Sequence, residues 1–375
     1  MYFEQGPIRP PSEATSLLIR VTRNCPWNKC AFCNTYKGKT FSRRPLADVL
    51  RDVDTARQVS DQVMQIARSM GQGDRITADV ISASGAKYGH WHYHVASWLY
   101  YGGRSVFLQD ANSLILKTSD LIRIIKYIRS AFPSVQRVTT YARADTAARK
   151  SKEDFLLLRE AGLSRIHMGM ESGADIVLKM VKKGIAANQL VQAAQIIRES
   201  GISLCWYIMP GLGGKEYTRE HALGTAEVIN AGNPDYVRFR TLSVLKGTPL
   251  DDMAQSGIFT VPQEDDMVEE QRLMIQSLKG VSTTIVSDHI LNLLQELEGT
   301  LPEDQDKLLN IIDRYLALPQ EAKNNYQLGR RAGIYLKLDD MQNKKRYNYV
   351  QGLIGQIGGP ENIQKELLRI RRGFV

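Results

Sequence analysis

The sequence of 375 residues predicts an α/β fold in which the strands of a parallel sheet alternate with helices. Six short runs rich in β-branched or aromatic residues have the pattern of strands, and helical patterns lie between them. From the second run onward, the starts are about 25 to 35 residues apart, the length of one strand–helix unit. The pattern fits an open sheet or a partial barrel equally well. The six runs are Ser16–Thr22, Ser105–Leu108, Arg137–Tyr141, Arg165–Met170, Ile202–Ile208 and Asp235–Arg240.

The gap between the first and second predicted strands is much longer than the others, which indicates an insertion at about residues 42–103. Within it, Leu46–Met70 is expected to be a helix because its apolar residues recur at helical spacing. The segment Tyr88–Tyr101 is dense in His, Trp and Tyr. The insertion is therefore expected to form a lid or an extra wall beside the sheet.

The last third of the sequence loses the strand pattern and is predicted to be mainly helical, through Gln263–Gly280 and again through Ser287–Leu297. We therefore expect a sheet-bearing domain over residues 1–258 and a helical C-terminal domain over residues 259–375. A basic helix is expected over Glu361–Arg372.

The composition is typical of a water-soluble globular protein, with 43% hydrophobic and 24% charged residues. No run approaches the roughly 18 apolar residues of a membrane span, and the first residues lack the pattern of a secretory leader. We therefore expect no membrane span and a cytoplasmic location. The formal charge of +9 favours anionic partners, but its excess lies in short clusters that are usually solvated faces, so nucleic-acid binding is only weakly indicated.

Three of the four cysteines, Cys25, Cys30 and Cys33, form a C-x4-C-x2-C motif directly after the first predicted strand. Such clustering argues against a disulfide scaffold and for thiolates that bind metal in a reducing compartment. The carboxyl end of a strand is also where α/β barrels place their active sites. Three thiolates can hold three irons of a [4Fe–4S] cubane and leave the fourth iron open to a small-molecule ligand.

Three other interpretations compete with the cubane. A structural zinc site needs a fourth ligand, and no closely spaced Cys or His pair supplies one. A plant-type [2Fe–2S] site needs a fourth cysteine further along the chain, and the remaining Cys205 lies in an apolar strand that is typical of a core. Three inert, buried cysteines fit poorly with the polar residues between them.

With this motif the sequence resembles the radical S-adenosylmethionine (radical SAM) superfamily, although the usual family spacing is C-x3-C-x2-C and this loop has one residue more. The resemblance implies a partial (β/α)6 TIM-like barrel, here with a helix-rich C-terminal extension. It also implies two cofactors, a [4Fe–4S] cluster and S-adenosyl-L-methionine. Phe32 stands where the family has an aromatic ring close to the adenine of that cofactor.

From about Ser16 to Leu250, several segments resemble the branch of oxygen-independent coproporphyrinogen oxidases and methylthiotransferase-like Fe–S oxidoreductases. In RIHMGMESG, the resemblance implies that Glu171 receives hydrogen bonds from ribose hydroxyls or an ammonium group. An ordinary helix-capping acid is the alternative for this residue. In YIMPGLGG, it implies that free backbone groups at Pro210 and Gly211 pair with the adenine edge.

The second predicted strand ends in FLQDANSL, where many family members have a Gly-Gly-Glu segment that binds the methionine amino group. Asp110, with Asn112 as a second candidate, would have to substitute for that segment. The third strand ends in TTYARAD, and Arg143 is a candidate partner for the methionine carboxylate, because a guanidinium can bind a carboxylate bidentately. A surface salt bridge is an equal alternative for Arg143.

The histidines offer two further candidates. In HWHYH, the residues His90, His92 and His94 would line one side of a strand and bind a second metal, whereas a helix, which their surroundings favour, would scatter them. A substrate-facing aromatic wall is the preferred interpretation. His289 is expected to open a C-terminal helix, behind a capping Ser or Asp, and is a candidate substrate contact.

The resemblance implies that one electron from the reduced cluster cleaves S-adenosylmethionine to methionine and a 5′-deoxyadenosyl radical, which abstracts hydrogen from an unidentified substrate. We expect a small-molecule or lipid substrate and a one-electron donor such as a flavodoxin or ferredoxin. Two alternatives stay open: a non-catalytic Fe–S carrier or scaffold, and a radical SAM tRNA-modifying enzyme. The tRNA alternative requires the basic segments Lys344–Arg346 and Arg369–Arg372 to face the active site.

Overall fold

The structure is a computed structural model that describes residues 1–373, without the side chain of Arg372. The chain divides into two compact units whose segments alternate along the sequence. Unit 1 consists of Met1–Asn28, Thr35–Met168 and Gln195–Leu204, and unit 2 of Lys29–Asn34, Gly169–Ala194 and Cys205–Val375. The domain boundary expected near residue 259 falls inside unit 2 and stays a prediction.

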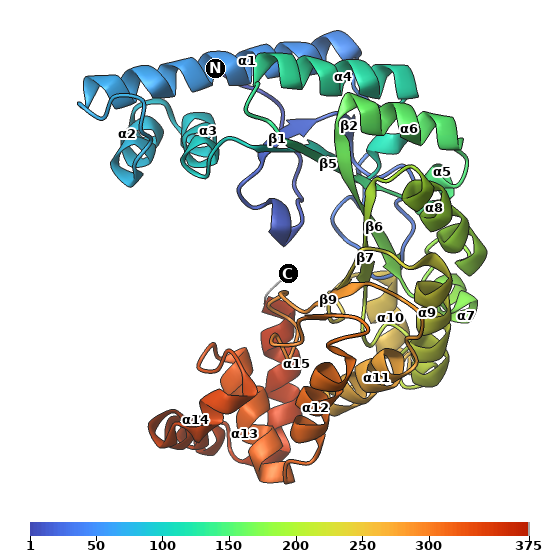
Figure 1. Ribbon diagram of the computed structural model, residues 1–375. Helices are drawn as coiled ribbons and strands as arrows, with labels where there is room; N and C mark the ends of the chain where they lie inside the picture. The colour runs from blue at the N-terminus through green and yellow to red at the C-terminus, as the bar shows by residue number, and fades with distance from the viewer. Residues whose placement is uncertain (374–375) are drawn as a thin grey trace. The chain divides into compact units, whose positions relative to one another are not determined.

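Unit 1 contains parallel strands paired in the order β1-β4-β5-β6, of which Figure 1 labels β1, β5 and β6. Their interior residues, such as Val106, Phe107 and Leu108, are fully buried, as expected for a parallel sheet covered by helices. The first four predicted strands are confirmed. They are β1 (Leu17–Arg20), β4 (Ser105–Gln109), β5 (Arg137–Ala142) and β6 (Leu163–Glu171), which passes into unit 2 after Met168.

The insertion of unit 1 is helical, as predicted for its first segment. Helix α1 buries Val49, Val53, Ala56 and Val63, which recur every three to seven residues along one face, and it contacts α3. The helices of this unit are α1 (Leu46–Ser69), α2 (Ala78–Tyr88), α3 (His90–Tyr100), α4 (Thr118–Ala131), α5 (Ala144–Ala147) and α6 (Lys152–Ala161), with 3₁₀ turns η1 (Pro11–Glu13) and η2 (Ser113–Ile115). A two-stranded antiparallel hairpin, β2 (Thr22–Arg23) and β3 (Ser42–Arg43), flanks the cysteine loop.

In unit 2, β7, β8 and β9 run parallel and β10 pairs antiparallel with β9. The last two predicted strands correspond to β7 and β8, while β9 and β10 are too short to leave a pattern in the sequence. The α/β class with a mostly parallel sheet is therefore confirmed. The bounds are β7 (Ser203–Ile208), which enters unit 2 at Cys205, β8 (Tyr236–Phe239), β9 (Thr284–Val286) and β10 (Gly299–Thr300).

After β8, unit 2 is mainly helical, and α11 and α15 confirm two of the predicted helices. Arg372, within the predicted last helix, has its side chain outside the described residues. The helices are α7 (Asp175–Met180), α8 (Ala187–Glu199), which unit 1 shares, α9 (Thr218–Gly232), α10 (Pro249–Gln255), α11 (Glu264–Gln276), α12 (Gln305–Leu316), α13 (Gln320–Arg331), α14 (Lys344–Gln356) and α15 (Ile363–Gly373), with 3₁₀ turns η3 (Leu338–Gln342) and η4 (Pro360–Asn362).

The helix predicted over Ser287–Leu297 is wrong, because the segment is irregular. Its leucines are buried, but side chains rather than helical bonds satisfy part of its backbone: the Ser287 hydroxyl donates to the Leu294 carbonyl at 2.7 Å. The Asn292 amide donates to the Phe239 carbonyl at 2.8 Å and fastens the segment to the end of β8. Closely spaced buried leucines therefore mark a loop folded onto the core, not a helix face.

No helix within residues 1–373 is both long and apolar enough to cross a bilayer.

Candidate active site

The cysteine loop joins β2 to β3 and carries three free thiols, with Cys30 buried and Cys25 and Cys33 partly exposed. In unit 1, Asn24 and Asn28 have positive φ angles of 65° and 49°, a region that asparagine tolerates better than most residues. The Asn28 backbone N–H donates to the Cys25 sulfur at 3.4 Å, and its side-chain amide donates to the Tyr36 carbonyl at 2.6 Å. The first part of the loop is therefore held by its own asparagines.

The second part of the loop belongs to unit 2. The Ala31 N–H donates to the Val181 carbonyl at 2.8 Å, and the Leu250 N–H donates to the Ala31 carbonyl at 3.1 Å. Ala31 is part of a buried apolar cluster, and Phe32 packs against that cluster. The Lys183 ammonium lies 5.9 Å from the centre of the Phe32 ring. Backbone pairing on both sides of Ala31 thus fixes the segment between Cys30 and Cys33.

The three thiols of the loop are a donor set that fits an iron–sulfur cluster. Within residues 1–373, no three Cys, His, Asp or Glu side chains gather around one point that a metal ion could occupy. Each thiolate of a cubane binds a different iron, so three thiols on one loop are a ligand set that such a cluster can use. The N–H group directed at the Cys25 sulfur is the kind of contact that tunes cluster thiolates.

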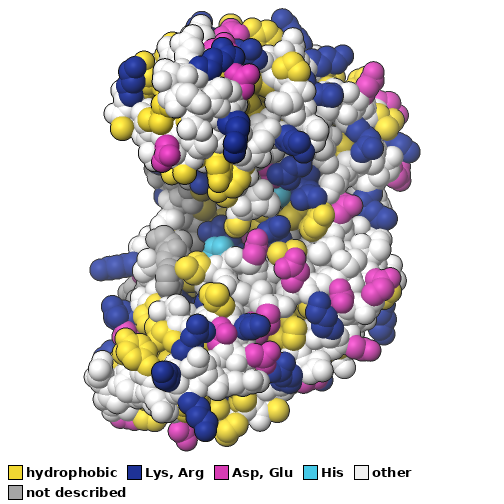
Figure 2. Space-filling view, turned by 60° about the vertical axis from the view of Figure 1, so that its left-hand side comes forward, with side chains coloured by type: hydrophobic (Ala, Val, Ile, Leu, Met, Phe, Trp, Pro, Cys, Tyr) yellow, Lys and Arg dark blue, Asp and Glu magenta, His cyan; other side chains and the backbone are white. Residues whose placement is uncertain are grey.

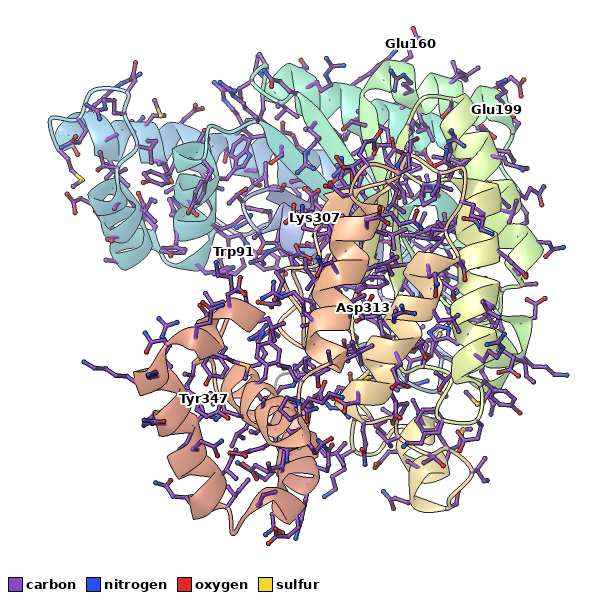
Figure 3. All side chains as sticks on the ribbon, turned by 60° about the horizontal axis from the view of Figure 1, so that its bottom comes forward. Trp91, Glu160, Glu199, Lys307, Asp313 and Tyr347 are labelled. Atoms are coloured by element: carbon purple, nitrogen blue, oxygen red, sulfur yellow. The ribbon has the colours of Figure 1, made fainter. Side chains whose placement is uncertain are left out.

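His90, His92 and His94 lie in the first turns of helix α3, not on a strand. The second metal site, which required them on one side of a strand, is therefore not formed. His92 is buried and its Nε2 lies 2.7 Å from the Gln62 side-chain oxygen. Trp91 (Figure 3) donates from its indole N–H to the Phe3 carbonyl at 2.7 Å. Burial lowers the pKa of His94 to about 4, so that side chain is neutral. The segment packs against the N-terminal residues of unit 1.

Asp110 is not available to the methionine amino group that the resemblance assigned to it. The residue is fully buried at the end of β4. Its Oδ2 accepts hydrogen bonds from the Arg20 guanidinium at 2.6 and 3.1 Å, and its Oδ1 accepts one from the Tyr36 hydroxyl. The second candidate, Asn112, is also buried: its carbonyl oxygen accepts the Arg143 backbone N–H at 3.2 Å. Neither side chain faces solvent.

Arg143 lies directly after β5 and is 8% exposed, which makes the simple surface salt bridge a poor description. Its Nε donates to Asp145 at 2.9 Å, and its guanidinium lies 5.4 Å from the centre of the Trp27 ring in the cysteine loop. A guanidinium next to an aromatic ring gains cation–π attraction. Arg143 is therefore placed beside the loop between Cys25 and Cys30, within unit 1.

Glu171 ends β6 in the left-handed conformation, with φ of 64°. Its carboxylate accepts a hydrogen bond from Lys183 at 2.8 Å, and both side chains are about nine-tenths buried. It does not cap α7, whose N-cap is Ala174. Gly169 makes room for the pair, since a Cβ there would lie 2.2 Å from the Glu171 Oε1. The helix-capping alternative is therefore wrong, and the carboxylate is part of an ion pair.

The turn after β7 is already hydrogen-bonded at the two groups proposed for adenine. The Pro210 carbonyl accepts the Leu242 N–H at 2.9 Å, and the Gly211 N–H donates to Glu270 at 2.8 Å. The Gly211 N–H is thus already bonded, whereas the Pro210 carbonyl keeps a second lone pair, and the adenine contact of this turn stays a prediction. Burial raises the pKa of Glu270 to about 8, and burial lowers the pKa of the neighbouring His221 to about 4. The two side chains lie 3.5 Å apart, and both shifts favour the neutral form at neutral pH.

His289 does not open a helix, because the segment around it is irregular. Its Nδ1 accepts the Leu291 N–H at 3.3 Å, and the preceding Asp288 pairs with Arg238 instead of capping a helix. Burial lowers the pKa of His289 to about 4, with nearby Arg240 as the next cause. The expected capping role of the residue before His289 is wrong.

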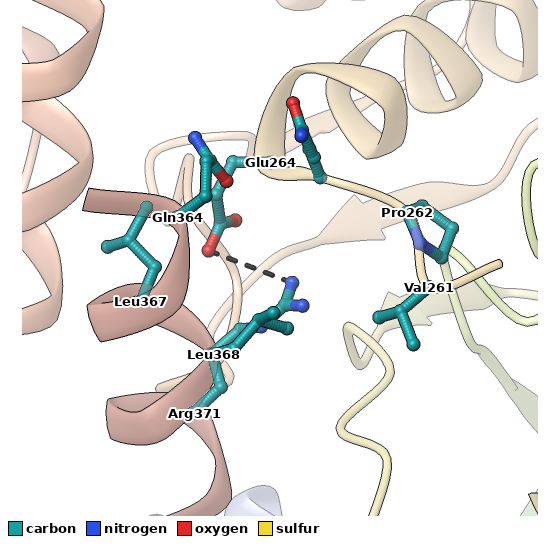
Figure 4. A pocket seen from close by; sticks show the side chains of 8 residues that line it. Val261, Pro262, Glu264, Gln364, Leu367, Leu368 and Arg371 are labelled. Atoms are coloured by element: carbon teal, nitrogen blue, oxygen red, sulfur yellow. Dashed lines mark ion pairs between the residues drawn. The ribbon is translucent and has the colours of Figure 1, made fainter. Parts of the chain in front are cut away.

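A small pocket in unit 2 lies between the start of α11 and helix α15 (Figure 4). Its volume is about 100 Å³, which is smaller than the several hundred Å³ usual for a cofactor. Arg371 borders it and lies 3.7 Å from Glu264, whose carboxylate also pairs with the buried Arg331 at 2.7 Å. This pocket is a gap beside a buried ion-pair network.

Four residues of this region were not predicted from the sequence: Tyr36, Lys183, His221 and Glu270. Tyr36 follows the last cysteine by three positions, so its place beside the motif was the only signal available. Lys183, His221 and Glu270 lie in ordinary helical or turn patterns. Tertiary contacts place Lys183 beside Phe32 and Glu171. They place Glu270 and His221 at the turn that follows β7.

Comparison with known proteins gives a family match for part of the chain. Residues 94–227, about a third of the sequence, match the family model of the radical SAM superfamily. This stretch begins after the cysteine loop. Members of the superfamily use a [4Fe–4S] cluster and S-adenosylmethionine, the two cofactors that the resemblance implies.

The curated relatives are not those of the expected branch. The tRNA uridine(34) acetyltransferase of Methanocaldococcus jannaschii is 21% identical over 279 residues, which cover 70% of this chain and 49% of that protein. The same enzyme of Methanocaldococcus infernus is 27% identical over 120 residues, covering 32% and 22%. The chain thus spans half or less of these relatives. The coproporphyrinogen oxidase branch is not confirmed.

Solved structures show low overall similarity. The Methanocaldococcus infernus Elp3 with an N-terminal deletion has a TM-score of 0.39 and 17% identity, covering 49% of this chain and 46% of that chain. Methylornithine synthase (PylB) has a TM-score of 0.43 and 14% identity, covering 81% and 82%.

Proposed function

We propose that the chain is a radical SAM enzyme in which Cys25, Cys30 and Cys33 hold a [4Fe–4S] cluster. The observation that carries the proposal is the loop of three free thiols in a chain whose residues 94–227 match the radical SAM superfamily. When bound, the cluster and S-adenosylmethionine would supply a 5′-deoxyadenosyl radical that abstracts hydrogen from the substrate.

The roles of the chain's own residues follow from their positions and charges. Phe32 would cover the cluster or the adenine with an apolar face. Glu171 would accept hydrogen bonds from ribose hydroxyls or the cofactor's ammonium group, with Lys183 holding its carboxylate in place. Arg143, beside Trp27, would pair with the methionine carboxylate. The Pro210–Gly211 turn would shape the adenine site through its backbone fold.

The test is anaerobic reconstitution with iron and sulfide, followed by dithionite and S-adenosylmethionine, with chromatography for 5′-deoxyadenosine. The proposal expects product from the wild type and from Cys205→Ala, whose thiol is buried in β7, and none from Cys30→Ala. A fully loaded cluster that never yields product, with or without candidate substrates, would favour an Fe–S carrier or scaffold instead.

A tRNA substrate is the second candidate, and the names of the curated relatives favour it. Lys344, Lys345 and Arg346 are exposed at the start of α14 and are a plausible phosphate contact. Figure 2 shows Lys and Arg side chains interspersed with Asp and Glu on the visible face, the pattern of a mixed rather than a uniformly basic surface. A small molecule or a lipid therefore stays a substrate alternative, and a flavodoxin or ferredoxin the proposed electron donor.

The tRNA candidate is tested by binding at several salt concentrations. The double variant Lys344→Gln with Lys345→Gln should weaken binding and reduce the slope of log affinity against log salt by about two. Lys307→Gln, an exposed lysine of α12, is the matched control. Affinity that is absent or independent of salt in the wild type would remove this candidate.

A further inference from the structure

The side chain of Asp110 makes contacts on both sides of the cysteine motif. Besides Arg20 and the Tyr36 hydroxyl, its Oδ2 accepts the Asn24 backbone N–H at 3.3 Å. Asn24 directly precedes Cys25, and Tyr36 follows Cys33 by three positions. One carboxylate at the end of β4 is thus bonded to both ends of the segment that carries the three thiols.

We propose that Asp110 is a positioning residue that clamps the two ends of the cysteine loop, and that Tyr36 is its partner in this role. The inference rests on the proposed function in one respect, since it takes the loop to be the cluster loop. It replaces the amino-group contact that the family resemblance had suggested for Asp110.

The clamp matters because a loop of this length has many conformations when its ends are not held together. Asn24 and Tyr36 are twelve positions apart, a stretch that could extend to about 40 Å. Bonding both ends to one side chain removes most of that freedom before any iron is present. Two further bonds support the closed form: Asn24 donates to the Thr40 carbonyl and Asn28 to the Tyr36 carbonyl, both at 2.6 Å.

The surroundings of Asp110 favour a fixed clamp over a ligand site. The carboxylate is fully buried and neutralised by Arg20, which also pairs with Glu4 at 3.1 Å. A Cβ on Gly6 would lie 3.0 Å from the Asp110 carboxyl carbon, so the N-terminal segment closes over it. Tyr36 is 2% exposed. Burial, and next the negative charge of Asp110, raise the pKa of its hydroxyl, so the phenol keeps its proton and stays a donor.

The critical variant is Tyr36→Phe, which removes one bond of the clamp and keeps the ring in the core. Its matched control is Tyr127→Phe, because Tyr127 donates to Asp54 at 2.5 Å in an exposed pair of the same unit. Asp110→Asn is the stronger variant. Two readouts apply: trypsin cleavage at Lys37 and Lys39 in the metal-free protein, and the rate of iron release to a chelator from reconstituted protein.

The clamp predicts that Tyr36→Phe accelerates both cleavage and iron release about tenfold or more, while the thermal midpoint and the Tyr127→Phe control change little. Asp110→Asn should exceed Tyr36→Phe in both rates. Wild-type rates in Tyr36→Phe would overturn the inference. If the wild type holds no cluster, the proposed function fails, and the cleavage rate of the metal-free loop still decides for or against the clamp.

Discussion

Replacing Glu270 with Gln should change how the stability of the protein depends on pH. Glu270 is 1% exposed on α11, and one carboxylate oxygen accepts the Gly211 N–H at 2.8 Å. The other oxygen, Oε2, is buried without a hydrogen-bond partner among the described residues. Glutamine has the same shape and keeps an acceptor for Gly211, but it cannot ionise. The variant therefore isolates the effect of the charge.

The magnitude follows from the pKa of Glu270, which burial raises from the ordinary value of 4.5 to about 8. Between these values the folded protein keeps a proton that the unfolded chain has lost, so stability falls as the pH rises and levels off above pH 8. Each pH unit costs about 1.4 kcal/mol, and the whole interval costs on the order of 5 kcal/mol. Glu270→Gln removes this loss, so its advantage over the wild type should grow with pH up to about 8.

Urea unfolding of the metal-free protein at pH 5, 6, 7, 8 and 9 measures the effect. Glu269→Gln is the control, because Glu269 is the exposed neighbour on the same helix and its replacement should leave the slope unchanged. If wild type and Glu270→Gln lose stability in parallel between pH 5 and 8, Glu270 is ionised in the folded state and the reasoning about its burial fails.

Three further predictions concern the thiols, the cofactor contact and a buried ion pair. Cys30→Ala should lose the broad cluster absorbance, whereas Cys205→Ala should keep it; loss in both would revive a four-cysteine site. Glu171→Ala should keep the cluster but weaken S-adenosylmethionine binding by about 1.5 to 3 kcal/mol, measured by calorimetry, and unchanged affinity would exclude the proposed contact. Arg331→Met should lower the free energy of unfolding by about 3 to 5 kcal/mol, because it leaves a buried carboxylate with a weaker partner. Arg272→Met, in an exposed pair, should cost less than about 1 kcal/mol, and equal losses would contradict the argument from burial.

Local patterns were sufficient for most of the fold. The run before the cysteines and the runs that became β4 to β8 are short, apolar and rich in β-branched residues, properties that any strand of a covered parallel sheet must have. The prediction of a helix over Ser287–Leu297 was wrong because the structure of this segment depends on a contact that is not local. Its leucines are buried by a loop that Asn292 fastens to β8, a contact between distant parts of unit 2 that periodicity cannot encode.

The candidate site also has features that neighbouring residues determine and features that tertiary contacts determine. The spacing of Cys25, Cys30 and Cys33 is local, so the sequence alone could predict a cluster loop and the class of chemistry that it would suit. Which acids and amides remain available to a ligand is not local. An aspartate at the end of a strand can bind a ligand or be buried, depending on the residues that fold over it.

For Asp110, those residues are Arg20, Asn24 and Tyr36, which come from 90, 86 and 74 positions away. For Gly211, the partner is Glu270, 59 positions away. The sequence by itself determined the α/β class and the thiol motif, because both arise from neighbouring residues. Only the tertiary structure decided that Asp110 and the Pro210–Gly211 turn are already bonded, because a buried polar group takes whichever partner folding brings within hydrogen-bond distance.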